Sequence, residues 1–245
     1  MATIARPATS RGVDHKFFAA MAGAIIVSVF LGFAHTYYLA GVFKAKLPSP
    51  IIHVHAVVFS SWVLFLTLQI VLVSAGRVSW HRRLGMFGAI LAFAMVVFGL
   101  LAATQSFARG FSPPGSGISP ATFYAIPCCE IVTFLVLFVA GFLRRFDAAA
   151  HKRLMLIATF ELLGPAIGRW PLAVVHKIPP VISLIILLFL LCVAAFDLWS
   201  RRRVHPVTLK AGSLVIVSQL LMFPIGQSAL WHRLADWILR VWLAA

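Results

Sequence analysis

Residues 53–75 read HVHAVVFSSWVLFLTLQIVLVSA, and this stretch decides the fold. Its 23 positions contain no Asp, Glu, Lys or Arg. About 20 consecutive apolar residues suffice for an α-helix to cross the hydrocarbon core of a bilayer. The stretch is therefore predicted to be one transmembrane helix.

Comparable runs recur along the whole chain. The composition is 62% hydrophobic and 11% charged, whereas soluble domains average about 25% charged residues. The sequence therefore predicts an all-α, polytopic membrane helix bundle of about seven transmembrane helices. The predicted spans are 17–40, 53–75, 84–104, 121–143, 152–170, 179–199 and 209–229.

The predicted organisation is one membrane domain with a short segment at each end. Residues 1–16 form a basic arm, 17–229 the seven-helix domain, and 230–245 an amphipathic C-terminus. The last segment mixes tryptophans with charged residues, which is typical of a helix lying in the membrane interface.

The distribution of Lys and Arg predicts the orientation. Fourteen of the 21 fall on the side of the N-terminal arm and of the loops after the second, fourth and sixth spans. By the positive-inside rule the N-terminus is cytoplasmic, the C-terminus lies outside, and the protein belongs to the cell's inner membrane. The net charge of +15 then reflects basic side chains such as Lys152 and Arg153 facing lipid phosphates, not binding to nucleic acid.

Several ionisable residues fall inside the predicted spans or at their outer ends. Burying one among lipids costs at least about 2.5–3.5 kcal/mol, so such residues usually mark function. Glu130, Glu161 and Arg169 are the candidate catalytic residues, and His35 and His55 are candidate metal ligands. The glutamates lie at matched depth in the outer half, next to prolines at 127, 165 and 224 that interrupt helical hydrogen bonding.

Two chemistries fit this set. Imidazole and carboxylate together suit a divalent metal ion, and the same groups could relay protons. A structural alternative stays open, in which the glutamates pair with Arg169 or with a histidine.

The stretch from His55 through Trp62 to Gly76, followed by His81, Arg82 and Gly85, resembles part of the core of the ascorbate-reducible b-type cytochrome family. The resemblance covers about residues 53–104, together with His151. It implies haem b, with His55, His81 and His151 as cofactor-binding residues and one inner haem between His81 and His151. In the alternative, His81 and His151 belong to basic clamps on lipid phosphate.

The His-x-His of residues 53–55 and the His-Arg-Arg-Leu-Gly of residues 81–85 are also similar to a pattern in small bacterial seven-span membrane proteins.

The leading hypothesis is a membrane redox protein that binds haem b or another metal and passes electrons between quinol and a partner on the outer face. The alternative is a membrane-embedded enzyme acting on a lipid or isoprenoid, with Glu130 and Glu161 as acid and base. A proton-coupled carrier or an accessory subunit of a membrane complex is a third hypothesis. The expected partners are the bilayer, a quinone or lipid substrate, and another membrane protein.

Overall fold

The computed structural model describes residues 8–45, 48–113, 116–172, 175 and 180–244. Within these ranges every element of secondary structure is a helix and there is no strand, which confirms the all-α prediction. The elements are α1 (Ala8–Phe33), a π-helical segment η1 (Ala34–Tyr38), α2 (Ala40–Phe43), α3 (Pro50–Ser74), α4 (Val78–Ala108), α5 (Pro120–Leu143), α6 (Ala148–Glu161), α7 (Gly164–Ile167), α9 (Pro180–Arg201), α10 (Pro206–Gln227) and α11 (Ala229–Ala244).

Six helices of the described chain are long and apolar enough to cross a membrane. They are α1 continued through η1, α3, α4, α5, α9 and α10. Their outer faces carry exposed leucine, isoleucine, valine and phenylalanine, which would be costly in water and is ordinary against lipid tails. The chain is therefore a multi-pass membrane protein.

The predicted continuous span 152–170 is wrong, because the structure breaks it into α6 and α7. Helix α6 has only 14 residues and ends at Glu161. Pro165 lies in the first turn of α7, and a proline at that position cannot hydrogen-bond to the carbonyl of Glu161 and would clash with it. The sequence predicted a kink in one helix at this proline, whereas the structure has two separate helices.

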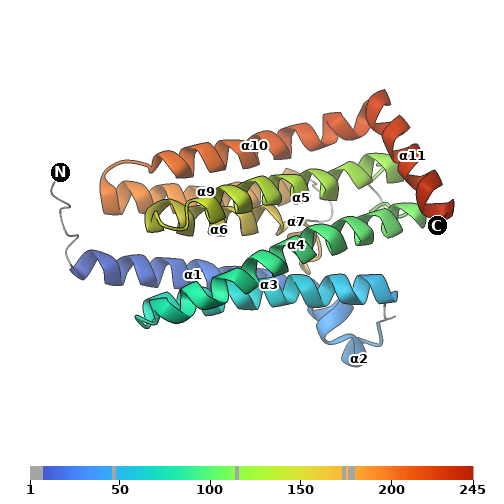
Figure 1. The fold of residues 1–245 in the computed structure, drawn as a ribbon. Helices are drawn as coiled ribbons and strands as arrows, with labels where there is room; N and C mark the ends of the chain where they lie inside the picture. Colours follow the sequence, from blue (N-terminus) through green and yellow to red (C-terminus); the bar gives the residue numbers. More distant parts are fainter. Residues whose placement is uncertain (1–7, 46–47, 114–115, 173–174, 176–179, 245) are drawn as a thin grey trace.

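Helix α6 lies at the centre of the bundle, flanked by α5, α9 and α10 (Figure 1). Every residue from Arg153 to Glu161 is buried. A helix surrounded by protein on all sides does not need a lipid-facing surface, so it can be short and can carry polar residues.

Figure 1 shows that the long helices run side by side and that the bundle has two distinct ends. We call one the basic end, where α1 begins and where the loops 75–77, 144–147 and 202–205 connect the helices. The other is the α11 end, where α11 crosses the bundle. Side-chain oxygen or nitrogen atoms cap three helices: Ser119 caps α5, Asp147 caps α6 and His205 caps α10.

The predicted C-terminal amphipathic segment is a helix, α11, packed on α4 and α5 (Figure 1). Ala235 is fully buried against this surface, and the Trp231 indole donates a hydrogen bond to the Ala121 carbonyl at 2.7 Å. Trp237 and Leu243 remain exposed. A buried face opposite an exposed apolar face is what a helix needs to lie between the bundle and lipid headgroups.

Candidate functional site

The two buried glutamates lie in one polar layer between neighbouring helices. Glu130 of α5 is 4% exposed, and Glu161 at the end of α6 is 0% exposed. The Glu130 carboxylate lies directly against Gly164, where any side chain would collide with it. The break after α6 thus places Gly164 where the Glu130 carboxylate needs space.

Uncharged polar side chains from α9 and α10 complete this layer. The Gln219 amide donates to Glu161 Oε2 at 3.4 Å, and its oxygen accepts from the Ser183 hydroxyl at 2.9 Å. Thr133 of α5 donates to Ser218 of α10 at 2.9 Å. The other carboxylate oxygen of Glu161, Oε1, is buried and has no hydrogen-bond partner.

No described Lys, Arg or His lies within ion-pair distance of Glu130 or Glu161. Arg169, predicted as part of the same site, instead donates to the Pro165 carbonyl at 2.7 Å and lies 5.1 Å from the Phe33 ring. For a buried carboxyl with no cation nearby, the neutral acid has a lower free energy than the charged carboxylate. The pair is therefore suited to exchange protons, with neutral hydrogen-bonding groups around it.

The candidate metal ligands His35 and His55 differ in their surroundings. His35 is in η1, is exposed, and packs edge-on to Phe43 with ring centroids 6.5 Å apart. His55 is half-buried against Phe59, and its Nδ1 atom has no hydrogen-bond partner. Across the described residues, no group of three or more His, Cys, Asp or Glu side chains could hold a metal ion.

The structure does bring His81 and His151 together at the basic end. Their ring centroids are 6.1 Å apart, and the ring planes are nearly perpendicular. His81 Nδ1 lies 3.0 Å from Gln69 Oε1, and His151 Nδ1 lies 2.9 Å from the Gly141 carbonyl oxygen.

Both partners of these rings are oxygen acceptors, so each Nδ1 carries the proton and donates it. In a neutral imidazole the Nε2 atom then presents its lone pair. Metal-ligating histidines are typically fixed in this way, through the ring nitrogen that does not bind the metal.

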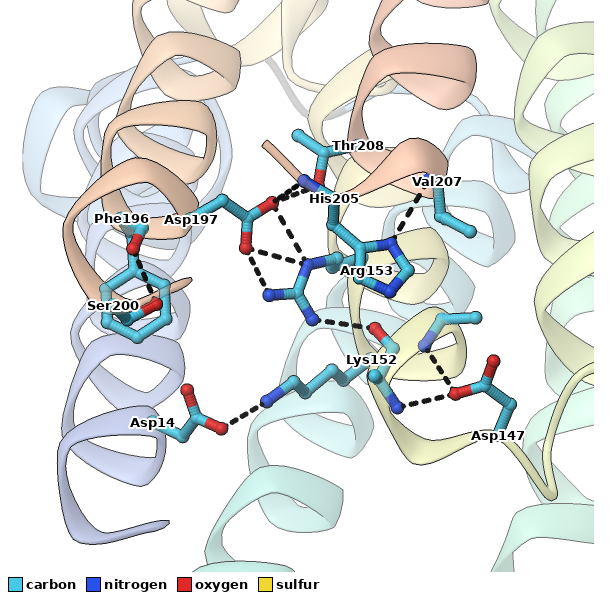
Figure 2. Close-up of polar contacts among 12 residues, drawn as sticks. Asp14, Asp147, Lys152, Arg153, Phe196, Asp197, Ser200, His205, Val207 and Thr208 are labelled. Carbon is cyan, nitrogen blue, oxygen red and sulfur yellow. Dashed lines mark hydrogen bonds and ion pairs between the residues drawn. The ribbon is translucent and has the colours of Figure 1, made fainter. Parts of the chain in front are cut away.

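A second buried cluster, missed by the sequence analysis, connects α6, α9 and α10 near the basic end (Figure 2). Arg153 and Asp197 are both 0% exposed and form an ion pair. Asp197 also accepts from the Thr208 hydroxyl at 2.6 Å and from the His205 backbone N–H at 3.1 Å. The remaining Arg153 nitrogen, Nη1, donates to the Ala149 carbonyl at 2.8 Å.

The prediction that Arg153 faces lipid phosphate is therefore wrong. The signal that could have found the cluster is Asp197, an acidic residue within an otherwise apolar run. Lys152 points elsewhere and pairs with Asp14 of α1 at 2.9 Å (Figure 2). Every charged hydrogen-bonding group of the Arg153–Asp197 pair has a partner, which identifies it as a structural connection between three helices.

His205, the capping residue beside this cluster, should make stability depend on pH. Its Nδ1 accepts from the Val207 N–H at 3.1 Å, so protonation of the ring would remove the cap. Burial lowers the pKa of His205 from its ordinary value of 6.5, and the positive charges of Arg153 and Arg201 lower it further, against the opposing effect of Asp197 and Asp147. Below pH 6.5 the unfolded chain then binds more protons at this position than the folded chain, so stability falls as the pH falls.

We expect the midpoint of thermal unfolding in detergent to decrease from pH 7 to pH 5 more steeply for the wild-type protein than for His205→Asn. Asparagine caps helices and does not titrate in this pH range. The variant keeps every other histidine, so the difference between the two pH curves reports on His205 alone. Parallel pH curves for the two proteins would contradict this role of His205.

No family model matches the chain, and no curated protein or solved structure was found to be similar to it.

Proposed function

We propose that the chain is a membrane redox protein in which His81 and His151 hold a b-type haem or another metal ion. The observation that carries this proposal is the adjacent pair of rings, each fixed through Nδ1 to an oxygen acceptor. Histidine pairs presented in this way leave two Nε2 donors for one ion.

The spacing of the rings supports the proposal. A metal–nitrogen bond is about 2 Å long, so two imidazoles that shared one ion would have to lie within several ångströms of each other. The centroids of His81 and His151 are 6.1 Å apart. Both histidines lie in the first turns of their helices, α4 and α6, so the backbone holds them at the same level of the bundle.

The residues around the pair have distinct roles in this proposal. Gln69 holds His81 twice, since its amide also donates to the His81 carbonyl at 3.3 Å. Gly141 contributes the carbonyl that orients His151, and a side chain at Gly141 would collide with Met155. A haem or redox metal bound there would supply one-electron chemistry, and these residues would set the orientation and basicity of the two histidine ligands.

The distribution of charge supports a particular membrane and orientation. The basic end, with exposed Arg82 and Arg83 beside His81, would face the cytoplasm by the positive-inside rule. The protein would then lie in a bacterial inner membrane, with its C-terminus outside and the His81–His151 pair near the cytoplasmic surface.

The test is the absorption spectrum and metal content of the purified protein. We expect either a b-type spectrum that changes on reduction or one bound metal ion per chain. His81→Ala and His151→Ala should each lose that signal completely, because one imidazole removed leaves half of the ligand pair. His35→Ala, which changes an exposed histidine distant in sequence, is the matched control and should retain it.

A colourless, metal-free wild-type protein, prepared from cells supplied with haem precursor and iron, would rule the proposal out. So would a signal that survives in both ligand variants.

A further inference from the structure

Two chains of hydrogen bonds lead to Glu161, the last residue of α6. In the first, the Ser183 hydroxyl of α9 donates to the Gln219 oxygen at 2.9 Å, and the Gln219 amide donates to Glu161 Oε2 at 3.4 Å. In the second, the Thr133 hydroxyl of α5 donates to Ser218 at 2.9 Å. The Ser218 hydroxyl in turn lies close enough to the Glu161 carboxyl for a hydrogen bond. Because Gln219 and Ser218 each accept from behind, each presents a donor to Glu161.

The neighbouring carboxyl, Glu130, has no such donors. It is 4% exposed, and it makes no hydrogen bond or ion pair with any residue that the structure describes. Its Oε1 atom lies against Gly164, on the α7 side of the helix break. The charge that acts on it is that of Glu161. The two carboxyls therefore share one buried layer, but only Glu161 has groups that stabilise a negative charge.

This difference in partners separates the protonation states of the two carboxyls. Hydrogen bonds donated to a carboxylate favour its charged form, whereas burial without partners favours the neutral acid. Two negative charges in one buried layer also repel each other, which disfavours ionising both groups. Glu161 is therefore the carboxyl that can ionise, and Glu130 is the one that remains a neutral acid.

Nothing around Glu161 fixes its charge permanently. Among the described residues no Lys, Arg or His forms an ion pair with it, in contrast to Asp197, which is held by Arg153. Of the groups near Glu161, Glu130 and Cys129 of α5 titrate, and the contacts from α9 and α10 are amide and hydroxyl groups, which do not. A hydroxyl can rotate to serve either the carboxylate or the neutral acid, so both states of Glu161 have partners.

We propose that Glu161 is a reversible proton-binding site inside the membrane bundle, distinct from the His81–His151 pair. It alternates between a carboxylate held by Gln219 and Ser218 and the neutral acid, taking its proton from water and returning it to water. Glu130 stays protonated beside it in both states. Ionisable groups inside membrane bundles commonly serve proton relays, and interrupted helices such as α6 and α7 are a recurring place for them.

The proton site does not depend on a metal at the His81–His151 pair. His151 and Glu161 are ten residues apart on α6, which separates them by about 15 Å along the helix axis. The two sites lie at different levels of the bundle, so each can be tested while the other is disabled.

The test is infrared spectroscopy of the full-length protein in phosphatidylcholine membranes, titrated from pH 5 to pH 9. The carbonyl stretch of a protonated carboxyl reports its protonation directly. We expect one buried carboxyl per chain to lose this band as the pH rises, and Glu161→Gln should abolish that transition. A second, pH-independent band should disappear in Glu130→Gln, while the transition of Glu161 persists.

The donors supply a readout that a merely structural role would not move. Ser218→Ala and Gln219→Leu each remove a donor to the charged form, so each should move the midpoint of the Glu161 transition upward by about one pH unit. Ser213→Ala removes an exposed hydroxyl from the same helix as Ser218 and should leave the midpoint unchanged. Circular dichroism establishes that each variant is folded.

The outcomes separate this site from the metal site. His81→Ala should lose any bound metal or haem and keep the wild-type carboxyl transition. The proposal is overturned if no buried carboxyl titrates in the wild-type protein, or if the transition survives in Glu161→Gln. It is also overturned if Ser218→Ala and Gln219→Leu shift the midpoint no more than Ser213→Ala does.

Discussion

Asp197→Ala should lower the free energy of unfolding by about 3–5 kcal/mol, because it strands the buried Arg153 guanidinium without its counter-ion. The same substitution removes the acceptor for Thr208 and for the His205 N–H, which holds the start of α10. The loss can be measured by titrating the protein with a denaturing detergent in mixed micelles and following helicity. The unfolding transition should move to much lower denaturant.

Two companion variants separate the ion pair from general effects of removing a carboxylate. Asp236→Ala changes an exposed aspartate on α11 and should alter stability by less than about 0.5 kcal/mol. The double variant Arg153→Met with Asp197→Leu should recover part of the loss, because apolar replacement of a buried pair is often close to neutral. Equal shifts for Asp197→Ala and Asp236→Ala would show that the Arg153–Asp197 pair is not a stabilising connection.

Gly32→Ala is expected to destabilise the bundle by about 3 kcal/mol, at the upper end of the usual cost of overpacking. A methyl group at Gly32 of α1 would overlap the backbone of Ala166 in α7. A backbone cannot rotate away as a side chain can, so α1 would have to move off the helix that follows Glu161. The unfolding midpoint in detergent measures the effect.

Gly23→Ala is the matched control on the same helix. No atom lies within 4 Å of the methyl group that alanine would add at this position. Alanine favours helix over glycine by up to about 1 kcal/mol, so this variant should be as stable as wild type or more stable. If Gly32→Ala were equally well tolerated, the close approach of α1 and α7 would be wrong.

Hydropathy predicted most of the fold, because six helices lie against lipid and must be apolar along their length. The spans predicted at 53–75, 121–143 and 209–229 differ from α3, α5 and α10 by three residues or fewer at each end. Hydropathy gave the wrong length for α6. This helix is enclosed by protein, so it does not need the length or the apolar surface of a lipid-facing span.

The candidate site divides in the same way. Depth along a helix is a local property, so the shared level of Glu130 and Glu161 could be predicted. Which side chains meet across helices is not local. Arg153 and Asp197 are 44 residues apart, and the basic flank of α6 gave Arg153 the pattern of a lipid-facing residue. The proximity of His81 and His151 followed only from a family resemblance, and their hydrogen bonds to Gln69 and Gly141 were not predicted.

The position of α6 has a consequence for how the protein reaches its native state. A helix of 14 residues that carries Arg153 and Glu161 is too short and too polar to be stable alone among lipid tails. Its free energy of insertion is favourable only once α5, α9 and α10 surround it. Because α9 and α10 are synthesised after α6, the nascent segment has to remain at the membrane until the later helices enclose it. The four-residue connection from Arg144 to Asp147 holds it next to α5 during that time. The helices of this bundle therefore assemble in a fixed order, and the central helix α6 is the last to reach its buried position.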